Sequence, residues 1–136
     1  METTTQTNTQ LVKQLYAYFN TGNIPALLNE LDNNVKWFNP GPQDILPWVG
    51  DREGKAAVAD FFKIVNENME FLKFEQKEYI EQGNKVVVLG YWEAKSKKTQ
   101  RVAKGNYAMT WTWKNGKVVQ HEAYTDTYNL VEAFRK

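Results

Sequence analysis

The dipeptide Asn115-Gly116 constrains the fold most, because it separates two runs that are each predicted to be a β-strand. Both residues accept the positive φ angles of a two-residue hairpin turn, so the pair predicts a tight antiparallel hairpin. Its two strands are expected from about Val102 to Trp113 and from Val118 to about Thr125. The C-terminal half of the chain is therefore expected to contain an antiparallel sheet.

Two further strands are predicted before this hairpin. One runs from about Phe71 to Glu81 and ends in the turn Gln82-Gly83-Asn84. The next begins with Val86-Val87-Val88-Leu89, and a polar tip from Lys95 to Gln100 returns the chain into the following strand. Four consecutive strands of this kind predict an antiparallel meander.

Helical patterns dominate the first half of the chain. Apolar residues three and four apart predict a helix from about Gln10 to Asn20, which Thr9 caps and Gly22 ends. A short helix restarts at Asn23-Ile24-Pro25, because proline is tolerated in a first helical turn. A short strand, Val35-Lys36-Trp37-Phe38, follows it.

Two more helices complete the predicted elements. After Gly54, four apolar residues fall at i, i+3, i+4 and i+7 and form one buried stripe: Val58, Phe61, Phe62 and Val65. A short amphipathic helix ends the chain. The order of two helices, a strand, a helix, four strands and a final short helix predicts an α+β fold. One domain is expected over residues 10–136, behind a disordered polar leader over residues 1–9.

The loop from Asn39 to Gly50 has an unusual composition. It holds three of the four prolines together with four apolar residues, Ile45, Leu46, Trp48 and Val49. A long loop with this apolar content is predicted to fold over an opening rather than to lie wholly in water.

Composition excludes several kinds of site. The chain has no cysteine and a single histidine, so neither a thiolate metal site nor a cluster of histidine ligands can form, and no cofactor or metal is expected. The net charge is +1, which gives no general attraction to nucleic acid or to anionic membranes. Five Trp, seven Tyr and seven Phe instead favour an apolar pocket. No run reaches the length of a membrane span, and the N-terminus lacks the blocks of a signal peptide, so a cytoplasmic protein is expected.

A basic segment surrounds the tip of the predicted hairpin at residues 95–104. It contains Lys95, Lys97, Lys98, Arg101 and Lys104. No aromatic residue is interleaved with these charges, as a nucleic-acid platform would require. Protection of a strand edge by lysine is therefore the preferred interpretation, and no nucleic-acid partner is expected.

Several segments in order resemble the nuclear transport factor 2 superfamily, which includes SnoaL-like proteins, ketosteroid isomerases and limonene epoxide hydrolases. They are Ala17-Tyr18-Phe19-Asn20-Thr21-Gly22-Asn23, Val35 to Pro42, Leu46 to Gly50, Gly54, Asn115 to Val119 and Tyr124 to Thr127. The resemblance implies a cone-shaped curved antiparallel sheet packed by three helices, with an apolar interior. The residues expected to line it and bind a ligand are Trp37, Trp48, Phe62, Trp92, Tyr107, Met109, Trp111 and Ala123.

The resemblance does not carry over the known reactions of the superfamily. Asn39 stands where ketosteroid isomerases have their Asp base, and their helix-1 Tyr and oxyanion-hole Asp fall on Leu15 and near Met109. The His and Asp of SnoaL-like cyclases match Met109 and Ala123, and the strand-4 Asp of limonene epoxide hydrolases also matches Ala123. Because an amide cannot accept a proton from a carbon acid, ketosteroid isomerisation by that mechanism is rejected.

His121 and Asn39 remain as the candidate catalytic residues. Alternation along the last strand places Val119, His121, Ala123 and Thr125 on the face toward the cavity and Val118, Gln120, Glu122, Tyr124 and Asp126 on the other. His121 is then an acid or base in the cavity, or a histidine satisfied by a neighbouring carbonyl. For Asn39 there are also two interpretations. Its side chain polarises a carbonyl or orients a water, or it is an ordinary turn residue before proline.

Three further points stay open on the residues. Asp126 is interpreted as a helix cap. Either Trp92 or Glu93 faces the cavity, with hydrophobicity favouring Trp92. A homodimer through the outer face of the sheet is implied by the resemblance, with five residues on that face: Thr110, Thr112, Gln120, Glu122 and Tyr124.

Two functions are consistent with these observations. The first is binding of a small apolar, ring-containing metabolite in the aromatic cavity. If the protein is an enzyme, cofactor-free proton transfer or water addition is expected, by an isomerase, a cyclase, or a hydratase or hydrolase. The alternative is a non-catalytic dimeric interaction module of the same fold, because every catalytic position compared with the family holds a neutral residue.

Overall fold

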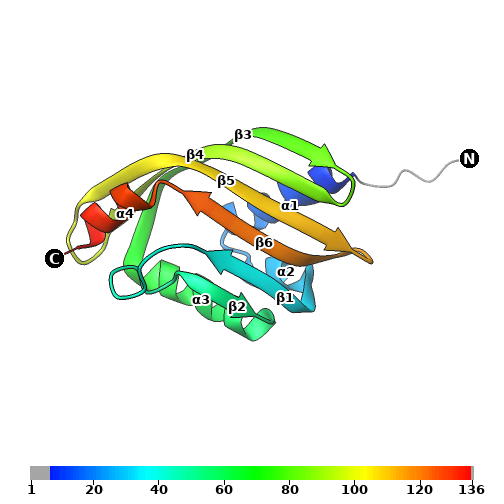
Figure 1. The fold of residues 1–136 in the computed structure, drawn as a ribbon, viewed down its shortest axis with the longest axis horizontal. Helices are drawn as coiled ribbons and strands as arrows, with labels where there is room; N and C mark the ends of the chain where they lie inside the picture. The colour runs from blue at the N-terminus through cyan, green and yellow to red at the C-terminus, as the bar shows by residue number, and fades with distance from the viewer. Residues whose placement is uncertain (1–6, 136) are drawn as a thin grey trace, which may run out of the picture.

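The computed structural model describes residues 7–135, which form four helices and six strands (Figure 1). In chain order they are α1 (Asn8–Asn20), α2 (Ile24–Asn29), β1 (Leu31–Asn39), β2 (Gly50–Glu53), α3 (Lys55–Asn68), β3 (Met69–Gln82), β4 (Lys85–Ser96), β5 (Val102–Lys114), β6 (Lys117–Thr125) and α4 (Thr127–Phe134). The α+β class is confirmed. Within residues 7–135, no helix is both long and apolar enough to cross a membrane.

All six strands belong to one sheet, in the order β2-β1-β6-β5-β4-β3. Strands β3 to β6 form the expected antiparallel meander, and the β5–β6 turn has positive φ angles at Asn115 (52°) and Gly116 (78°). Strand β1, however, pairs with β6 in parallel, so the expectation of a purely antiparallel sheet is corrected to a mixed sheet. The chain between β1 and β6 is long enough to supply the crossover that a parallel pair needs.

Strand β2 is an edge strand that the sequence did not predict. It pairs antiparallel with β1, from Lys36 opposite Glu53 to Asn39 opposite Gly50. Its residues, Gly50-Asp51-Arg52-Glu53, show no alternation of apolar and polar side chains, so the sequence pattern did not indicate a strand. Only backbone pairing with β1 identifies it.

Helix α1 begins earlier than predicted. Thr7, and not Thr9, is its N-cap: the Thr7 hydroxyl accepts from the Gln10 N–H, and the Gln10 side chain accepts from the Thr7 N–H. This capping box satisfies two end groups at once, which Thr9 cannot do at its position. The Thr9 hydroxyl instead donates to Glu81 on β3, 2.7 Å away. Of the predicted polar leader, residues 8 and 9 are helical and residues 1–6 lie outside the described part.

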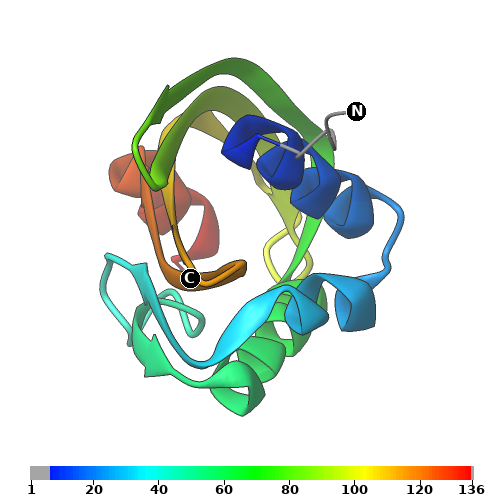
Figure 2. The same ribbon diagram turned by 90° about the vertical axis from the view of Figure 1, so that its right-hand side faces the viewer.

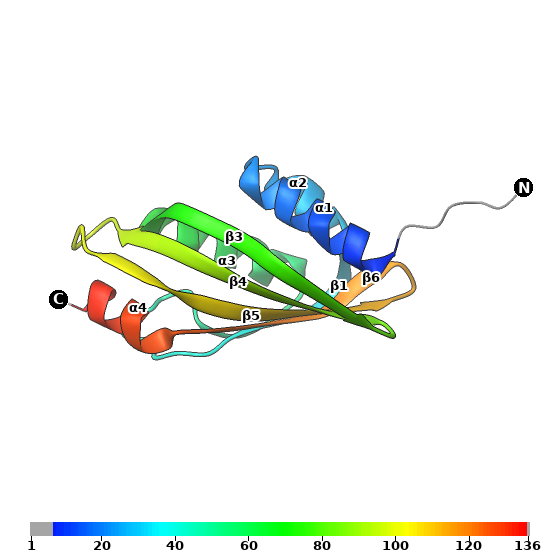
Figure 3. The same ribbon diagram turned by 90° about the horizontal axis from the view of Figure 1, so that it is seen from above.

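The sheet is curved, with α1 packed against β3 and β4 and α3 packed against β1 and β2 (Figure 2). The view from above places α1 and α2 together along one side of the strands (Figure 3). Helix α4 lies at the end of the molecule where the β4–β5 hairpin turns (Figure 1). Asp126 caps α4 by accepting from the Asn129 N–H, as predicted.

A bulge in β6 changes which side chains face the interior. Trp113 is opposite Val118 and Thr112 is opposite Gln120, so Val119 is an extra residue without a partner. Val118 is therefore fully buried in the core, and the expectation that Val119 faced inward and Val118 outward is wrong. Beyond the bulge, His121 and Ala123 are buried as alternation predicted.

Candidate functional site

A cavity of about 120 Å³ lies between the sheet and the helices. Every candidate residue of the sequence analysis lines it: Trp37, Asn39, Trp48, Phe62, Trp92, Tyr107, Met109, Trp111, His121 and Ala123. The structure thus brings together residues from β1, the loop after it, α3, β4, β5 and β6. Their roles in binding or catalysis remain predictions.

The loop after β1 contributes to this enclosure. Leu46 and Val49 are buried, and the Trp48 ring lines the cavity with its centre 5.0 Å from that of Phe134 on α4. The apolar residues of this loop therefore pack against the interior and against α4.

The cavity wall carries no formal charge. Among residues 7–135 its lining contains no Asp, Glu, Lys or Arg, and its titratable groups are Tyr16, Tyr107 and His121. Of Trp92 and Glu93, the two candidates on β4 to face the cavity, Trp92 lines it. Glu93 is outside the lining and accepts a hydrogen bond from the Tyr91 hydroxyl at 2.7 Å. In the same described range, no three His, Asp or Glu side chains gather as a metal site would require.

His121 is 3% exposed and lies between two indole rings. Cross-strand pairing sets Trp37 of β1 on one side and Trp111 of β5 on the other, with ring centres 4.1 and 3.9 Å from the imidazole. Its Nδ1 lies 3.1 Å from the backbone oxygen of Thr110. A carbonyl oxygen only accepts, so Nδ1 carries the proton and Nε2 keeps a lone pair.

Burial lowers the pKa of His121 to about 3, and the hydrogen bond to Thr110 opposes this shift only in part. The imidazole is therefore neutral at physiological pH and a weak base. The Thr110 carbonyl is the neighbouring carbonyl of one interpretation in the sequence analysis, in which such a group satisfies His121.

Two tyrosine hydroxyls and two indole N–H groups around the cavity have partners in the protein. Trp111 Nε1 donates to the Tyr16 hydroxyl at 3.2 Å, which donates to Met109 Sδ at 3.3 Å. The Tyr107 hydroxyl donates to the Glu75 carbonyl at 3.0 Å, and Trp92 Nε1 donates to the Thr125 hydroxyl. Burial raises the pKa of Tyr107 to about 12 and that of Tyr16 well above its usual value, so both phenols are neutral.

Sequence reasoning missed Tyr16. Its place beside Leu15 on the apolar side of α1 is a signal that could have found it. Both Leu15 and Tyr16 line the cavity, and the tyrosine hydroxyl joins α1 to β5 through Trp111.

Two residues that line the cavity each have a buried hydrogen-bond donor with no acceptor in the described part of the protein. Within residues 7–135, the buried side-chain polar atoms without a hydrogen bond are Trp37 Nε1, Asn39 Nδ2 and Arg52 Nε. Trp37 and Asn39 line the cavity, whereas Arg52 is outside the lining and donates through Nη1 to the Ala57 carbonyl at 3.2 Å. Asn39 Nδ2 makes no hydrogen bond to the turn that follows it.

A groove on the surface adjoins the cavity. It lies beside the end of α1, α3 and the start of β3, and five of its residues also line the cavity: Phe19, Phe62, Val65, Met69 and Phe71. Phe19 is at the centre of this boundary, with its ring centre 5.9 Å from Phe62 and 5.7 Å from Phe71. Sequence patterns did not indicate the groove, because it forms where separate elements meet.

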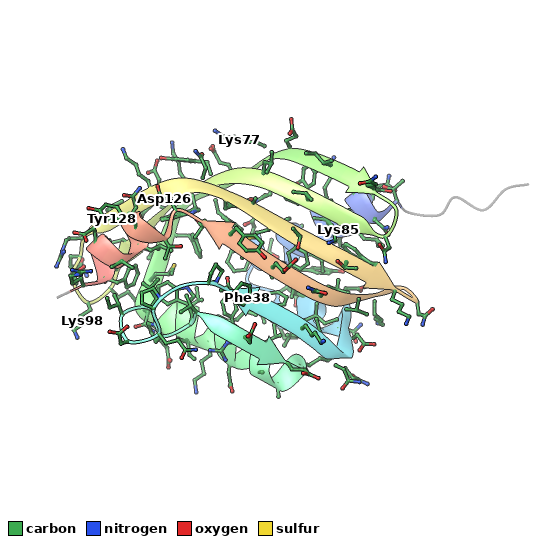
Figure 4. All side chains as sticks on the ribbon, viewed as in Figure 1. Phe38, Lys77, Lys85, Lys98, Asp126 and Tyr128 are labelled. Carbon is green, nitrogen blue, oxygen red and sulfur yellow. The ribbon has the colours of Figure 1, made fainter. Side chains whose placement is uncertain are left out.

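The basic segment of residues 95–104 has structural partners. Arg101 donates to the backbone oxygens of Glu132 and Arg135 at 2.7 and 2.6 Å, which holds the end of α4. Lys97 Nζ donates to the Asn66 carbonyl. Lys98 projects at the hairpin tip, at the end of the molecule (Figure 4).

Comparison with known proteins places the chain in a family and identifies similar structures. Residues 12–121 match the family model of the SnoaL-like domain. The structure is similar to an NTF2-like protein of unknown function from Burkholderia pseudomallei K96243, with 26% identity, a TM-score of 0.88 and coverage of 97% of this chain and 100% of the other. It is similar to an NTF2-like protein from Burkholderia xenovorans LB400, with 29% identity, a TM-score of 0.86 and coverage of 98% and 100%.

A third similar structure contains a ligand by its description. It is TerC co-crystallized with polyporic acid, with 26% identity, a TM-score of 0.81 and coverage of 95% of this chain and 98% of TerC. The search among curated proteins found no match. The resemblance seen in the sequence is confirmed at the level of family and fold.

Proposed function

The chain belongs to the SnoaL-like domain family, and we propose that it binds a small, uncharged, ring-containing molecule in the cavity between the sheet and its helices. One observation carries this proposal: a concave space between the sheet and the helices whose lining, among residues 7–135, is largely aromatic and holds no charged side chain. Sites for small molecules are concave and mostly apolar, with a few placed polar groups.

The volume limits the size of the ligand. An engineered apolar protein cavity of about 150 Å³ admits benzene. The cavity here is about 120 Å³ and partly open, so it accommodates a single six-membered ring, and a small substituent extends beyond it. The adjoining groove shares five lining residues with this space and is the proposed route of entry from the surface.

The charge of the ligand follows from the lining. A carboxylate or ammonium group moved into this space loses its hydration and finds no opposite charge, which costs several kcal/mol, roughly, even after relaxation. Tyr16, Tyr107 and His121 are all neutral and cannot compensate such a charge. A neutral ligand is therefore favoured.

Binding, and not proton transfer, is the role we assign to both candidate catalytic residues. An imidazole with a pKa of about 3 holds a proton poorly at neutral pH, and the Asn39 amide does not accept one. His121 instead offers the lone pair of Nε2, and Asn39 offers its side-chain amide. The co-crystal of TerC with polyporic acid supports a small organic molecule as the ligand of this fold.

The test uses two molecules of the same shape and the same number of non-hydrogen atoms, α-methylstyrene and benzoate. The neutral hydrocarbon is expected to raise the melting temperature and to quench tryptophan fluorescence, because Trp37, Trp48 and Trp111 line the cavity. Benzoate is expected to do neither. Absence of any response to α-methylstyrene up to its solubility limit would overturn the proposal.

A homodimer through the outer face of the sheet is a separate proposal. Phe38 lies on this face (Figure 4), and the ring centre of Tyr124, which is 43% exposed, is 6.3 Å from that of Phe38. Tyr124→Lys is expected to yield monomers in light scattering, because it places a charge in the interface. Tyr128→Lys, an exposed site on α4, is the matched control (Figure 4). A wild-type monomer at high concentration would refute the dimer.

A further inference from the structure

We infer that the ligand is a neutral phenol, whose hydroxyl group donates a hydrogen bond to Nε2 of His121. This inference rests on the proposed function, because it names the chemical class of the molecule that binds in the cavity. It makes His121 the residue that selects the ligand, through a hydrogen bond and not through proton transfer.

Nε2 of His121 is the acceptor in this hydrogen bond. Nδ1 of the same ring donates to the Thr110 carbonyl oxygen, 3.1 Å away, so Nε2 carries a lone pair and no proton. Within residues 7–135, Nε2 has no hydrogen-bond partner. It is also not one of the buried unpaired nitrogens of this range, which are Trp37 Nε1, Asn39 Nδ2 and Arg52 Nε. Nε2 therefore keeps surface open to the cavity that His121 lines.

The two indole rings around His121 define where a ligand reaches the imidazole. Trp37 lies on one side and Trp111 on the other, with ring centres 4.1 and 3.9 Å from that of His121. Both faces of the imidazole are therefore covered, and its Nδ1 edge faces Thr110. The Nε2 edge remains, where the lone pair lies in the plane of the ring and accepts a donor.

Most donors of the cavity wall are, by contrast, buried or already paired. Trp37 Nε1 and Asn39 Nδ2 have almost no surface for a ligand to contact. Other donors have partners in the protein: Trp92 Nε1, Trp111 Nε1 and the hydroxyls of Tyr16, Tyr107 and Thr125. Within residues 7–135 the exception is Trp48 Nε1, in the loop after β1, where the indole packs against Phe134. A ligand beside His121 therefore meets an acceptor and supplies the donor itself.

The type of donor follows from charge and shape. Among residues 7–135 the lining holds no charged side chain, so an ammonium group or a carboxylate is disfavoured. A phenol is neutral at pH 7, because its pKa is about 10, and it is a stronger donor than an aliphatic alcohol. Its flat ring matches the aromatic lining. The small Ala123 side chain, on the same face of β6 as His121, leaves room beside the imidazole.

The low pKa of His121 agrees with an acceptor that does not take the proton. Burial lowers this pKa to about 3, because the wall does not stabilise a charged imidazole. Proton transfer from a phenol would place two opposite charges in the cavity. The neutral imidazole keeps its lone pair, so the phenol stays protonated and donates.

The first experiment observes Nε2 directly in the wild-type protein. The chain has one histidine, so ¹⁵N labelling of histidine gives a single pair of ring-nitrogen signals in NMR spectra. Saturating phenol is expected to move the Nε2 signal toward lower frequency, in the direction of a protonated nitrogen, because Nε2 accepts a hydrogen bond. Toluene, which has the same number of non-hydrogen atoms and no donor, is expected to move it far less.

Calorimetry measures the same preference as an affinity. Phenol, toluene and cyclohexanol have equal numbers of non-hydrogen atoms, and the quantity compared is the dissociation constant of toluene divided by that of phenol. His121→Phe keeps a ring and removes the acceptor, so it is expected to lower this ratio by about tenfold or more. Asn33→Phe, at an exposed position of β1, is the matched control and should leave the ratio unchanged. The NMR measurement needs no variant, so a folding defect of His121→Phe does not remove the test.

The outcomes separate this inference from the proposed function. An Nε2 signal that stays in place while phenol binds overturns the hydrogen bond to His121 and leaves ligand binding intact. Tighter binding of cyclohexanol than of phenol, or an unchanged ratio in folded His121→Phe, also overturns it. Failure of phenol, toluene, cyclohexanol and α-methylstyrene alike to bind overturns the proposed function itself.

Discussion

His121 donates its Nδ1–H to the backbone oxygen of Thr110, 3.1 Å away on the neighbouring strand, and is otherwise enclosed by Trp37 and Trp111. This single contact holds the imidazole in one tautomer and supplies no charge that would stabilise its protonated form. Burial therefore dominates, and the pKa of His121 falls to about 3.

The stability of the protein is predicted to depend on pH through this residue. Above about pH 6.5 the imidazole is neutral in both states. As the pH falls from there toward about 3, the unfolded chain binds a proton that the folded protein does not, so the free energy of unfolding decreases. The slope approaches about 1.4 kcal/mol per pH unit.

Urea unfolding of wild type and of His121→Asn between pH 5 and 7.5 measures this dependence. The chain has one histidine, so the difference between the two proteins isolates its contribution. Asn is chosen because its amide can still donate to Thr110. Parallel pH profiles for the two proteins would show that His121 is not protonated differently on folding.

Filling the cavity is predicted to abolish ligand binding while the fold is kept. In Ala123→Leu the larger side chain projects from β6 into the space that the ring would occupy. Added apolar burial of about 1–2 kcal/mol offsets a packing strain of about 1–3 kcal/mol, so stability should change little. Titration with α-methylstyrene and urea unfolding measure the two effects.

Ala56→Leu provides the matched control for this substitution, because Ala56 is exposed on α3. It should leave binding unchanged. Retention of wild-type affinity in Ala123→Leu would mean that the ligand binds elsewhere.

Phe19 is predicted to control the rate at which a ligand reaches the cavity. Its ring lines both the cavity and the groove and packs against Phe62, Phe71 and Phe74. Phe19→Ala should therefore raise the association rate constant of α-methylstyrene several-fold in stopped-flow fluorescence. It should also destabilise the fold by roughly 2–4 kcal/mol, because a large ring is lost from a packed cluster.

Phe38→Ala makes the same deletion on the outer face of the sheet, beside Tyr124 (Figure 4). Its association rate constant should equal that of wild type. An unchanged rate in Phe19→Ala would argue for a different route into the cavity.

Gly90 is predicted to be intolerant of any side chain. A Cβ atom at this position would collide with the Glu75 carbonyl oxygen on β3 and with the ring of Tyr107 on β5. Gly90→Ala should lower the free energy of unfolding by about 3 kcal/mol or more, because both contacts involve packed groups. Urea unfolding measures this change in the free energy of unfolding. Ala108→Gly on β5 is the reference for the ordinary difference in stability between Ala and Gly in a strand. Equal stability of Gly90→Ala and wild type would contradict this packing.

Local chemistry explains which parts of the fold could be predicted. The β5–β6 turn depends on two adjacent residues with positive φ, and the cap of α4 depends on Asp126 and the N–H three residues later. Thr7 was missed as the cap of α1, although its partner Gln10 stands at the right spacing. The signal was present, but Thr9 stood closer to the first apolar residue.

Pairing between strands decided what the local patterns did not contain. Edge strand β2 has no apolar period, and the bulge at Val119 reverses the facing of Val118, which a strict alternation assigned to the outside. Both features depend on the register with a neighbouring strand. A residue's own sequence context does not encode that register.

By itself, the sequence determined nine of the ten helices and strands, their order, the family and ten of the residues that line the cavity, because apolar periodicity and turn residues act over a few positions. Only the tertiary structure decided the state of those residues. The neutral imidazole of His121 and the unpaired donors of Trp37 and Asn39 result from burial and from the partners that each atom lacks or finds. Solvent access and partner geometry are properties of the assembled sheet and helices, and so no single segment of the chain carries them.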